Sequence, residues 1–488
     1  MKTKALMALS VSLVCLAGAS DVEAQNRTRS ISQSTAAQAA QQHPALVQEF
    51  GGELEGARGA YVRNVGARVT AQTNITGGSN SFRVTALNSP VMNAFAVPGG
   101  YLYFTRQLLA LMNDEAELAS VIGHEAGHIT ARHSAERQRS NILSQLGALV
   151  VGVVSGSGQL AQVAGQAGQL VTLRYSRGQE IEADTLGVRY MTAAGYDPAA
   201  SASLLNSLGA WSDLEPRFQG GAGDQRSTPS WARTHPLSAD RVRRSTAEAQ
   251  RTGRLGQGIR NREQHLAAIN GMIFDDDPAQ GVIEGREFLH PDLRLAFSIP
   301  QGFQMQNGAR AVTIVGQSGQ AQFSTGPFNG NLSTYIGQVF QALGGQQARI
   351  QYPQPQTTTI NGIPAAYSSA RVQSQSGVVD VTVVAYQMDS NSAYHFAMIT
   401  RGGTGLGAFE PMVGSLRRLS AQQAAAIRPR IIQIHTVRAG DTVASLSGRM
   451  AYTSYQQERF RTLNGIAANA ALRPGDRVKL VVYGTRST

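Results

Sequence analysis

Three histidines and a glutamate within ten residues of this chain have spacings that suit metal chemistry. His124, Glu125 and His128 form the pattern HEAGH, and His133 follows five residues after His128. Residues four apart lie on one face of a helix, so His124 and His128 can aim their ring nitrogens at one ion. Glu125 lies off that axis, which suits a general base for a metal-bound water. The stretch predicts part of a zinc-dependent hydrolytic site; the alternative is an amphipathic helix with two surface histidines.

His133 is poorly placed to complete this site. The metzincin pattern HExxHxxGxxH requires a glycine where this chain has Ala131 and a histidine where it has Ser134. On a continuous helix, five residues rotate a side chain by about 500°, which leaves it roughly 140° off the ligand face. We therefore expect His133 to cap or pack near the helix end.

A third ligand has to come from another segment, and the acidic cluster QEIEAD can supply it. The cluster contains Glu180, Glu182 and Asp184. Glu180 and Asp184 are four apart and share a helix face, whereas Glu182 points roughly the other way. Two histidines and a glutamate are a common catalytic zinc set, and a carboxylate one turn on can orient a zinc-bound histidine. The alternative is a solvated acidic helix face.

The elements that must position these residues are mainly helices. A helical pattern runs over residues 107–139 and returns over 179–195, and residues 113–115 offer an N-terminal cap before the helix that carries HEAGH. Upstream, SFRVTALNSPVMNAFAVPGGYLYFT alternates like strands around a PGG turn. Residues 140–173 carry no charged side chain but are too rich in Ser, Gln and Gly for a confident membrane span. They predict small-residue helices that pack on the domain or cover its cleft, or alternatively a flap that contacts a membrane surface.

Three segments in order resemble one family. SVIGHEAGHITARHS, YSRGQEIEADTLGVRYM and THPLSADRVR are similar to the HtpX and BepA group of zinc metallopeptidases, gluzincins related to the CAAX prenyl proteases. The resemblance covers roughly residues 40–250, including VMNAFAVPGGYLYFTRQLL before the metal motif. It implies one zinc ion per chain and a catalytic base, and an aspartate that orients a ligand. The ligands would be His124, His128 and Glu180, the base Glu125 and the aspartate Asp184.

The same resemblance implies two further features of the site. Residues 91–97 would form an edge strand to which a substrate adds as a β-strand, with Asn93, Ala94 and Phe95 in contact with it. His235, in a histidine-proline motif, would either stabilise an oxyanion or occupy the open zinc position in a closed state; a structural turn is the alternative. HtpX and the prenyl proteases have transmembrane helices, whereas this chain shows only the uncharged 140–173 stretch, which favours an exported branch.

The start of the chain predicts export. MKTKALMALSVSLVCLAGASDVEAQ combines a basic start, an apolar run and a Val-Glu-Ala ending, which predicts a signal peptide over residues 1–24 and a periplasmic protein. Cys15 is the only cysteine, so the mature chain is expected to lack disulfides. The net charge of +11 comes almost wholly from arginine. It reflects either arginine preference or attraction to anionic surfaces. No aromatic-basic pattern points to nucleic acid.

The 488 residues are enough for two or three domains. We predict an α+β protein: a mainly helical zinc metalloprotease domain with a small edge sheet over 25–265, an α+β sandwich-like domain over 284–420, and a linker over 421–431. Residues 432–484 resemble a LysM module, a βααβ unit that binds N-acetylglucosamine chains such as peptidoglycan. The residues that fit its pattern are Thr436, Gly440, Asp441, Thr442, Asn464, Leu472, Pro474 and Gly475. A degenerate packing module is the alternative.

These patterns lead to one main functional prediction: an exported zinc metalloendopeptidase that cleaves unfolded or misassembled envelope proteins. It would contact peptidoglycan through residues 432–484. Residues 140–173 would provide any contact with a membrane surface. Two alternatives remain at this point. One is a chaperone-like or peptidoglycan-binding envelope protein with a latent or structural zinc site, closed by His235 as fourth ligand. The other is a hydrolase of cell-wall cross-links.

Overall fold

The computed structural model describes residues 29–133, 175–218, 231, 234–236, 239–344, 350–374 and 377–486. The predicted signal peptide and the uncharged stretch at 140–173 lie outside these ranges. Helices and sheets both contribute, so the predicted α+β class is confirmed. Within the described ranges, no helix combines the length and the apolar character needed to cross a membrane.

The HEAGH motif lies on α5 (Glu115–Thr130), a helix whose residues are all buried. The helix begins where the sequence predicts, because the Asp114 side chain accepts a hydrogen bond from the Glu117 backbone N–H at 2.9 Å. The predicted cap divides the helical pattern that starts at residue 107, and α4 (Arg106–Leu111) precedes it as a separate short helix. The cap thus fixes the first residue of the helix that carries the metal motif.

The acidic cluster lies on α8 (Arg177–Ala193), which crosses α5 at close range. Ser176 begins α8 with a capping box. A Cβ atom on Gly123 would come within 2.8 Å of the Gly187 carbonyl oxygen, so small residues at the crossing let the two backbones approach. The close approach brings the carboxylates of α8 to the histidine face of α5.

A three-stranded sheet lies beside these helices. It contains β1 (Arg83–Leu87), β2 (Ala94–Val97) and β3 (Tyr101–Thr105) in the order β1-β3-β2. Strands β2 and β3 pair antiparallel around residues 98–100, as the alternating pattern predicts, and β1 pairs parallel to β3. Strand β2 therefore forms an edge of the sheet.

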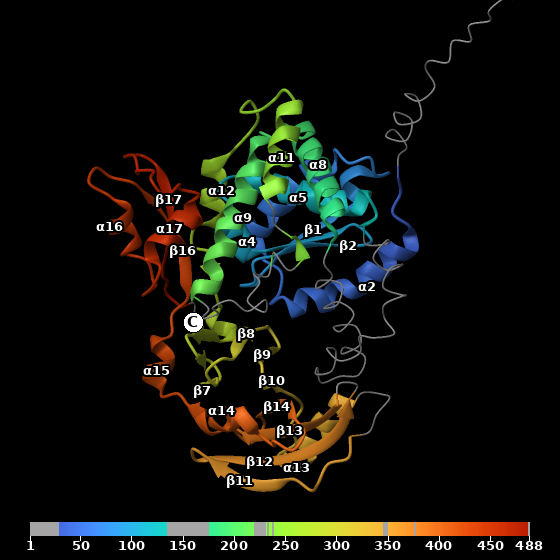
Figure 1. Cartoon of the computed structure of the whole chain (residues 1–488), viewed down its shortest axis with the longest axis vertical. Helices are drawn as coiled ribbons and strands as arrows, with labels where there is room; N and C mark the ends of the chain where they lie inside the picture. Colours follow the sequence, from blue (N-terminus) through green and yellow to red (C-terminus); the bar gives the residue numbers. More distant parts are fainter. Residues whose placement is uncertain are drawn as a thin grey trace, which may run out of the picture.

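Each face of this small sheet is covered by helices. Helix α2 (Gln33–Glu49) packs on the face that presents Phe95, Val97 and Tyr103. The opposite face joins the main core together with α3 (Gly56–Thr70) and α5. Helices α9 (Ala199–Phe218), α11 (Ala239–Arg251) and α12 (Arg262–Ile269) complete the helical layer in Figure 1.

The C-terminal segment packs against this helical layer, as the red elements of Figure 1 show. Its elements are β16 (Arg430–Thr436), α16 (Val443–Ser447), α17 (Gln456–Asn464) and β17 (Arg477–Tyr483), and β16 also pairs with β4 (Ile273–Phe274). Lys479 is fully buried, and its Nζ donates to the carbonyl oxygens of Ala110, Leu111 and Met112 at 2.8–2.9 Å. One hydrophobic core runs through both parts, across the sequence-based boundaries at 265 and 432.

A second core lies between two sheets of the middle unit. A seven-stranded sheet has the order β11-β12-β13-β14-β10-β9-β8 and a four-stranded sheet the order β15-β7-β6-β5. Helix α13 (Leu332–Gly344) packs on the other face of the larger sheet. The larger sheet comprises β11 (Gln356–Ile360), β12 (Ile363–Ser374), β13 (Gly377–Gln387), β14 (Ala393–Arg401), β10 (Gly319–Thr325), β9 (Ala311–Gly316) and β8 (Gln304–Asn307). The smaller sheet comprises β15 (Arg417–Arg418), β7 (Leu295–Ser298), β6 (Glu287–His290) and β5 (Val282–Glu284).

Candidate metal centre

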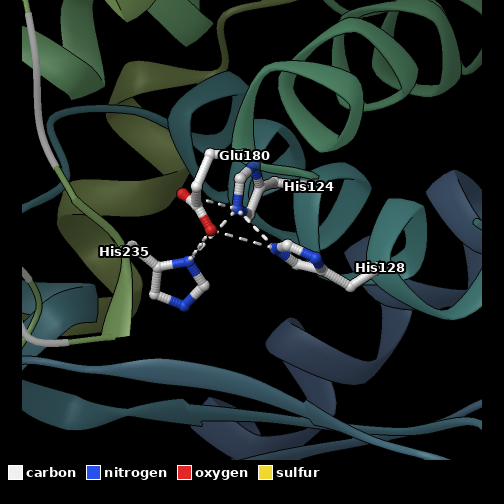
Figure 2. Close-up of side chains that lie close together, drawn as sticks. All are labelled: His124, His128, Glu180 and His235. Carbon is white, nitrogen blue, oxygen red and sulfur yellow. Dashed lines mark hydrogen bonds and ion pairs between the residues drawn. The ribbon is translucent and has the colours of Figure 1, made fainter. Parts of the chain in front are cut away.

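Four buried side chains from three parts of the chain point toward one another (Figure 2). They are His124 and His128 of α5, Glu180 of α8, and His235 from the segment between α9 and α11. One ligand atom from each lies within 4.8 Å of all the others. The exposed fraction is 6% for His124 and 0% for the other three. The structure thus brings together the three predicted ligands and adds His235 to them.

Several distances within this group are close to those between ligands that share one metal ion, with zinc as the reference. Zinc–nitrogen bonds of about 2.0–2.1 Å place neighbouring ligand atoms about 3.3 Å apart. The Nε2 atoms of His124 and His128 lie 3.1 Å apart, and His124 Nε2 lies 3.4 Å from His235 Nδ1. Glu180 Oε1 lies 3.0 Å from His235 Nδ1 and 3.5 Å from His128 Nε2. The four side chains could therefore hold one metal ion.

Two of these ligands are held in the protonation state that a metal requires. Burial lowers the pKa of His128 well below its usual value. Burial alone would raise the pKa of Glu180, but the charges of His235 and Arg241 outweigh it and hold that pKa well below the usual range. A neutral imidazole and an ionised carboxylate are the forms that bind zinc.

Asp184 and Arg241 form a buried support behind the ligands. Asp184 Oδ1 lies 2.8 Å from His124 Nδ1, so it can orient that ring, as the resemblance implies. Arg241 donates to both Asp184 oxygens at 2.7 and 2.8 Å, and its NH1 lies 2.6 Å from Glu180 Oε2. Burial opposes charge on Asp184, yet Arg241 lowers the pKa of that carboxyl. Burial also disfavours charge on His124, but the Asp184 carboxylate raises the pKa of that ring overall.

Arg241 is the functional residue that the sequence analysis missed. Two carboxylates on one buried helix face require a cation beside them, because an uncompensated buried charge is costly. The quoted motif THPLSADRVR contains this arginine, but α11 is distant from α8 in sequence and its contact face cannot be read from the motif. The requirement for a cation is the signal that could have found it.

Glu125 and the segment before His235 lie at the same centre. Glu125 is fully buried, and its Oε1 lies 3.5 Å from His235 Nε2. The ring of Trp231 stacks on His235 with centroids 4.4 Å apart, and the Tyr175 ring stacks on His128 at 3.6 Å. Aromatic rings thus hold both imidazole planes.

The predicted substrate residues lie at the start of the edge strand β2. The Asn93 Oδ1 atom accepts a 3.4 Å hydrogen bond from the hydroxyl of Thr234, the residue before His235. Ala94 is fully buried in the main core, and Phe95 packs under α2, where its ring stacks on Tyr103 at 4.9 Å. Asn93 therefore lies beside the metal centre, whereas the Phe95 side chain points away into the core.

Comparisons with known proteins match the part of the chain that builds this centre. Residues 57–249 match peptidase family M48. The Beta-barrel assembly-enhancing protease of Yersinia pestis is 30% identical over 191 residues, 37% of this chain and 37% of that protein. The Mitochondrial metalloendopeptidase OMA1 of Arabidopsis thaliana is 35% identical over 26% of each chain. The protein of the same name from Schizosaccharomyces pombe is 32% identical over 38% of this chain and 51% of its own length. The match thus spans about a quarter to a half of each relative.

Proposed function

Because residues 57–249 match peptidase family M48, we propose that this chain is an exported, periplasmic zinc metalloendopeptidase. Its proposed substrates are unfolded or misassembled envelope proteins. One observation carries the proposal: both histidines of HEAGH and a distant glutamate converge on one buried point, with Glu125 beside them. The names of the relatives, a beta-barrel assembly-enhancing protease and a metalloendopeptidase, support the reaction class.

Each residue of the centre has a proposed role. His124, His128 and Glu180 would hold the zinc ion. Zinc bound there supplies a Lewis acid that lowers the pKa of water and polarises a peptide carbonyl. Glu125 accepts a proton from the attacking water at its carboxylate and passes it to the leaving amine. Asp184 holds the Nδ1 proton of His124, and Arg241 keeps Asp184 and Glu180 charged.

We propose that the substrate backbone pairs with β2 from residue 93 onward. Strand β2 is an edge of its sheet, and an edge strand offers backbone groups to an extended peptide. Because the Ala94 and Phe95 side chains are buried, selectivity would rest on main-chain pairing more than on contacts with these two side chains. Such pairing suits unfolded chains of varied sequence.

The position of His235 supports a closed resting state. Its Nδ1 takes the fourth corner of the ligand group, 3.4 Å from His124 Nε2 and 3.0 Å from Glu180 Oε1. A catalytic zinc site keeps its fourth position open for water or substrate. This favours occupation of the zinc position over an oxyanion role for this state. The position of His235 also supports the second candidate function, a client-binding protein with a latent zinc site.

His235→Ala should increase cleavage of a casein-like unfolded substrate by about tenfold or more, because it removes the side chain that blocks the fourth position. Initial rates on full-length protein measure the effect. The double variant with Glu125→Gln should be inactive, which shows that the gain runs through the proposed base. A fall in the rate for His235→Ala would instead assign His235 an assisting role.

We also propose that residues 432–484 bind peptidoglycan. The pattern residues divide into two kinds: Asn464 is buried and hydrogen-bonded to both backbone groups of Lys479, whereas Thr442 and Pro474 are exposed. The exposed set is available to a glycan. The proposed membrane contact at 140–173 stays a prediction, since that stretch lies outside the described residues.

Full-length protein should co-sediment with purified sacculi, and Pro474→Arg should reduce the bound fraction several-fold by placing a bulky cation in the exposed loop. Leu255→Arg is the matched control, because Leu255 is 43% exposed in the loop between α11 and α12. Equal sedimentation of both variants would exclude this loop as the glycan contact.

A further inference from the structure

The chain turns back sharply after the HEAGH helix. Helix α5 ends at Thr130, and Arg132 adopts a left-handed conformation with φ of 61°. The sequence-based prediction places His133 on a continuous helix and does not include this turn. It returns His133 to the side of α5 that carries His128, so that the His133 Nδ1 atom lies 2.8 Å from His128 Nδ1.

His133 connects a metal-ligand histidine to a carboxylate. Its ring is 1% exposed, and its Nε2 lies 3.3 Å from Glu182 Oε2 on α8. The Glu182 side chain is 61% exposed. The three side chains therefore form a line that runs from the centre of the site to its solvent-facing edge: His128, His133 and Glu182.

The proton positions along this line follow from the metal site. His128 directs Nε2 at the ligand group, so a neutral His128 that binds through Nε2 carries its proton on Nδ1. That proton can only be donated to an unprotonated His133 Nδ1. His133 then carries its own proton on Nε2, where Glu182 accepts it. Both short contacts are hydrogen bonds in this arrangement.

The two zinc histidines would thus be supported differently. Asp184 contacts the Nδ1 atom of His124 directly at 2.8 Å, whereas His133 is the group at Nδ1 of His128. Stacking on Tyr175 sets the plane of the His128 ring but leaves its rotation within that plane to a directional contact. The His133 hydrogen bond supplies that contact.

We infer that His133, supported by Glu182, is a positioning residue that fixes the tautomer and the in-plane orientation of His128. The inference rests on the proposed zinc site, but it concerns metal affinity and not cleavage. Partners of this kind typically change metal affinity by 10–100-fold when they are removed.

The test compares two replacements of His133 in the full chain. His133→Phe keeps the ring volume but offers no acceptor, and it should weaken zinc binding by about 10–100-fold in competition with a chelator. His133→Asn places an oxygen near the position of Nδ1 and should restore affinity to within a few-fold of wild type. The absorption spectrum of the cobalt-loaded protein should change for His133→Phe and stay close to wild type for His133→Asn.

His43→Phe is the matched control. His43 is also a buried histidine with Nδ1 in a 2.9 Å hydrogen bond, to Tyr103. It lies on α2 and is not part of the ligand group, so its replacement should leave zinc affinity unchanged. Wild-type affinity in His133→Phe would overturn the inference. Equal losses of zinc affinity in both His133 variants would overturn it too, because they would indicate that His133 acts only through packing. If zinc binding follows the expected pattern but neither the wild type nor His235→Ala cleaves the unfolded substrate, the proposed function is refuted and this inference stands.

Discussion

Glu125→Gln should leave zinc bound and lower peptide cleavage by about 10²–10⁴-fold, the range that a positioned general base contributes. The amide keeps the shape of the side chain but cannot accept the proton of the attacking water. Glu125 is fully buried on α5 between the two histidine ligands and is not part of the four-residue ligand group. The zinc content of this variant should therefore stay at the wild-type level while its cleavage rate falls.

The measurement combines zinc stoichiometry with initial rates on an unfolded substrate, in the wild type and in the His235→Ala background. Glu117→Gln is a matched control, because Glu117 is a buried glutamate two turns earlier on α5 that bonds Asn113 and Ser203. It should retain cleavage. Full activity of Glu125→Gln would refute the proposed mechanism.

Glu180→Ala should have the second large effect, the loss of zinc itself. The substitution removes the only carboxylate of the four-residue group, whereas the contact between Asp184 of α8 and His124 remains. Zinc stoichiometry should fall from one per chain toward zero, and cleavage with it. Elemental analysis after dialysis against metal-free buffer measures this directly.

The same variant also tests the buried support. Arg241 loses its 2.6 Å contact with Glu180 but keeps both hydrogen bonds to Asp184. Breaking a buried ion pair costs about 3–5 kcal/mol, and the remaining pair makes the lower part of that range the expected loss in free energy of unfolding. Glu248→Ala removes another carboxylate that is paired with arginines, Arg189 and Arg251, but is not part of the ligand group, so it should keep zinc at full stoichiometry. One retained zinc ion in Glu180→Ala would remove Glu180 from the ligand set.

The local parts of the site could be predicted from the sequence, and the long-range parts could not. The spacing of His124 and His128 sets their common face, and the four-residue step from Glu180 to Asp184 does the same on α8. Arg241 was missed because its partners are determined by how α11 packs on α8. The turn at Arg132 was missed because nothing in the local pattern interrupts the helix before His133.

The fold shows the same division. The β2–β3 hairpin follows its alternating pattern and PGG turn, and it was predicted with its turn in place. Strand β12 was not predicted, although it is twelve residues long, because its alanines and serines give no clear apolar alternation. The packing of the C-terminal strands on α4 was also missed. Their alternation predicts a sheet but not the surface that the sheet covers.

The buried lysine of β17 has a consequence for the timing of folding. Its Nζ atom donates to backbone oxygens that lie up to 369 residues earlier in the chain, and the whole middle unit lies between the two in sequence. Contacts of such separation close late, because the entropy of the intervening loop must be overcome before they contribute. The core around the metal helices is therefore completed only after the C-terminal strand has arrived. The metal site of such a peptidase would be complete only when nearly all of its own chain has folded. By then little of the chain remains in the unfolded form that the protein is proposed to cleave.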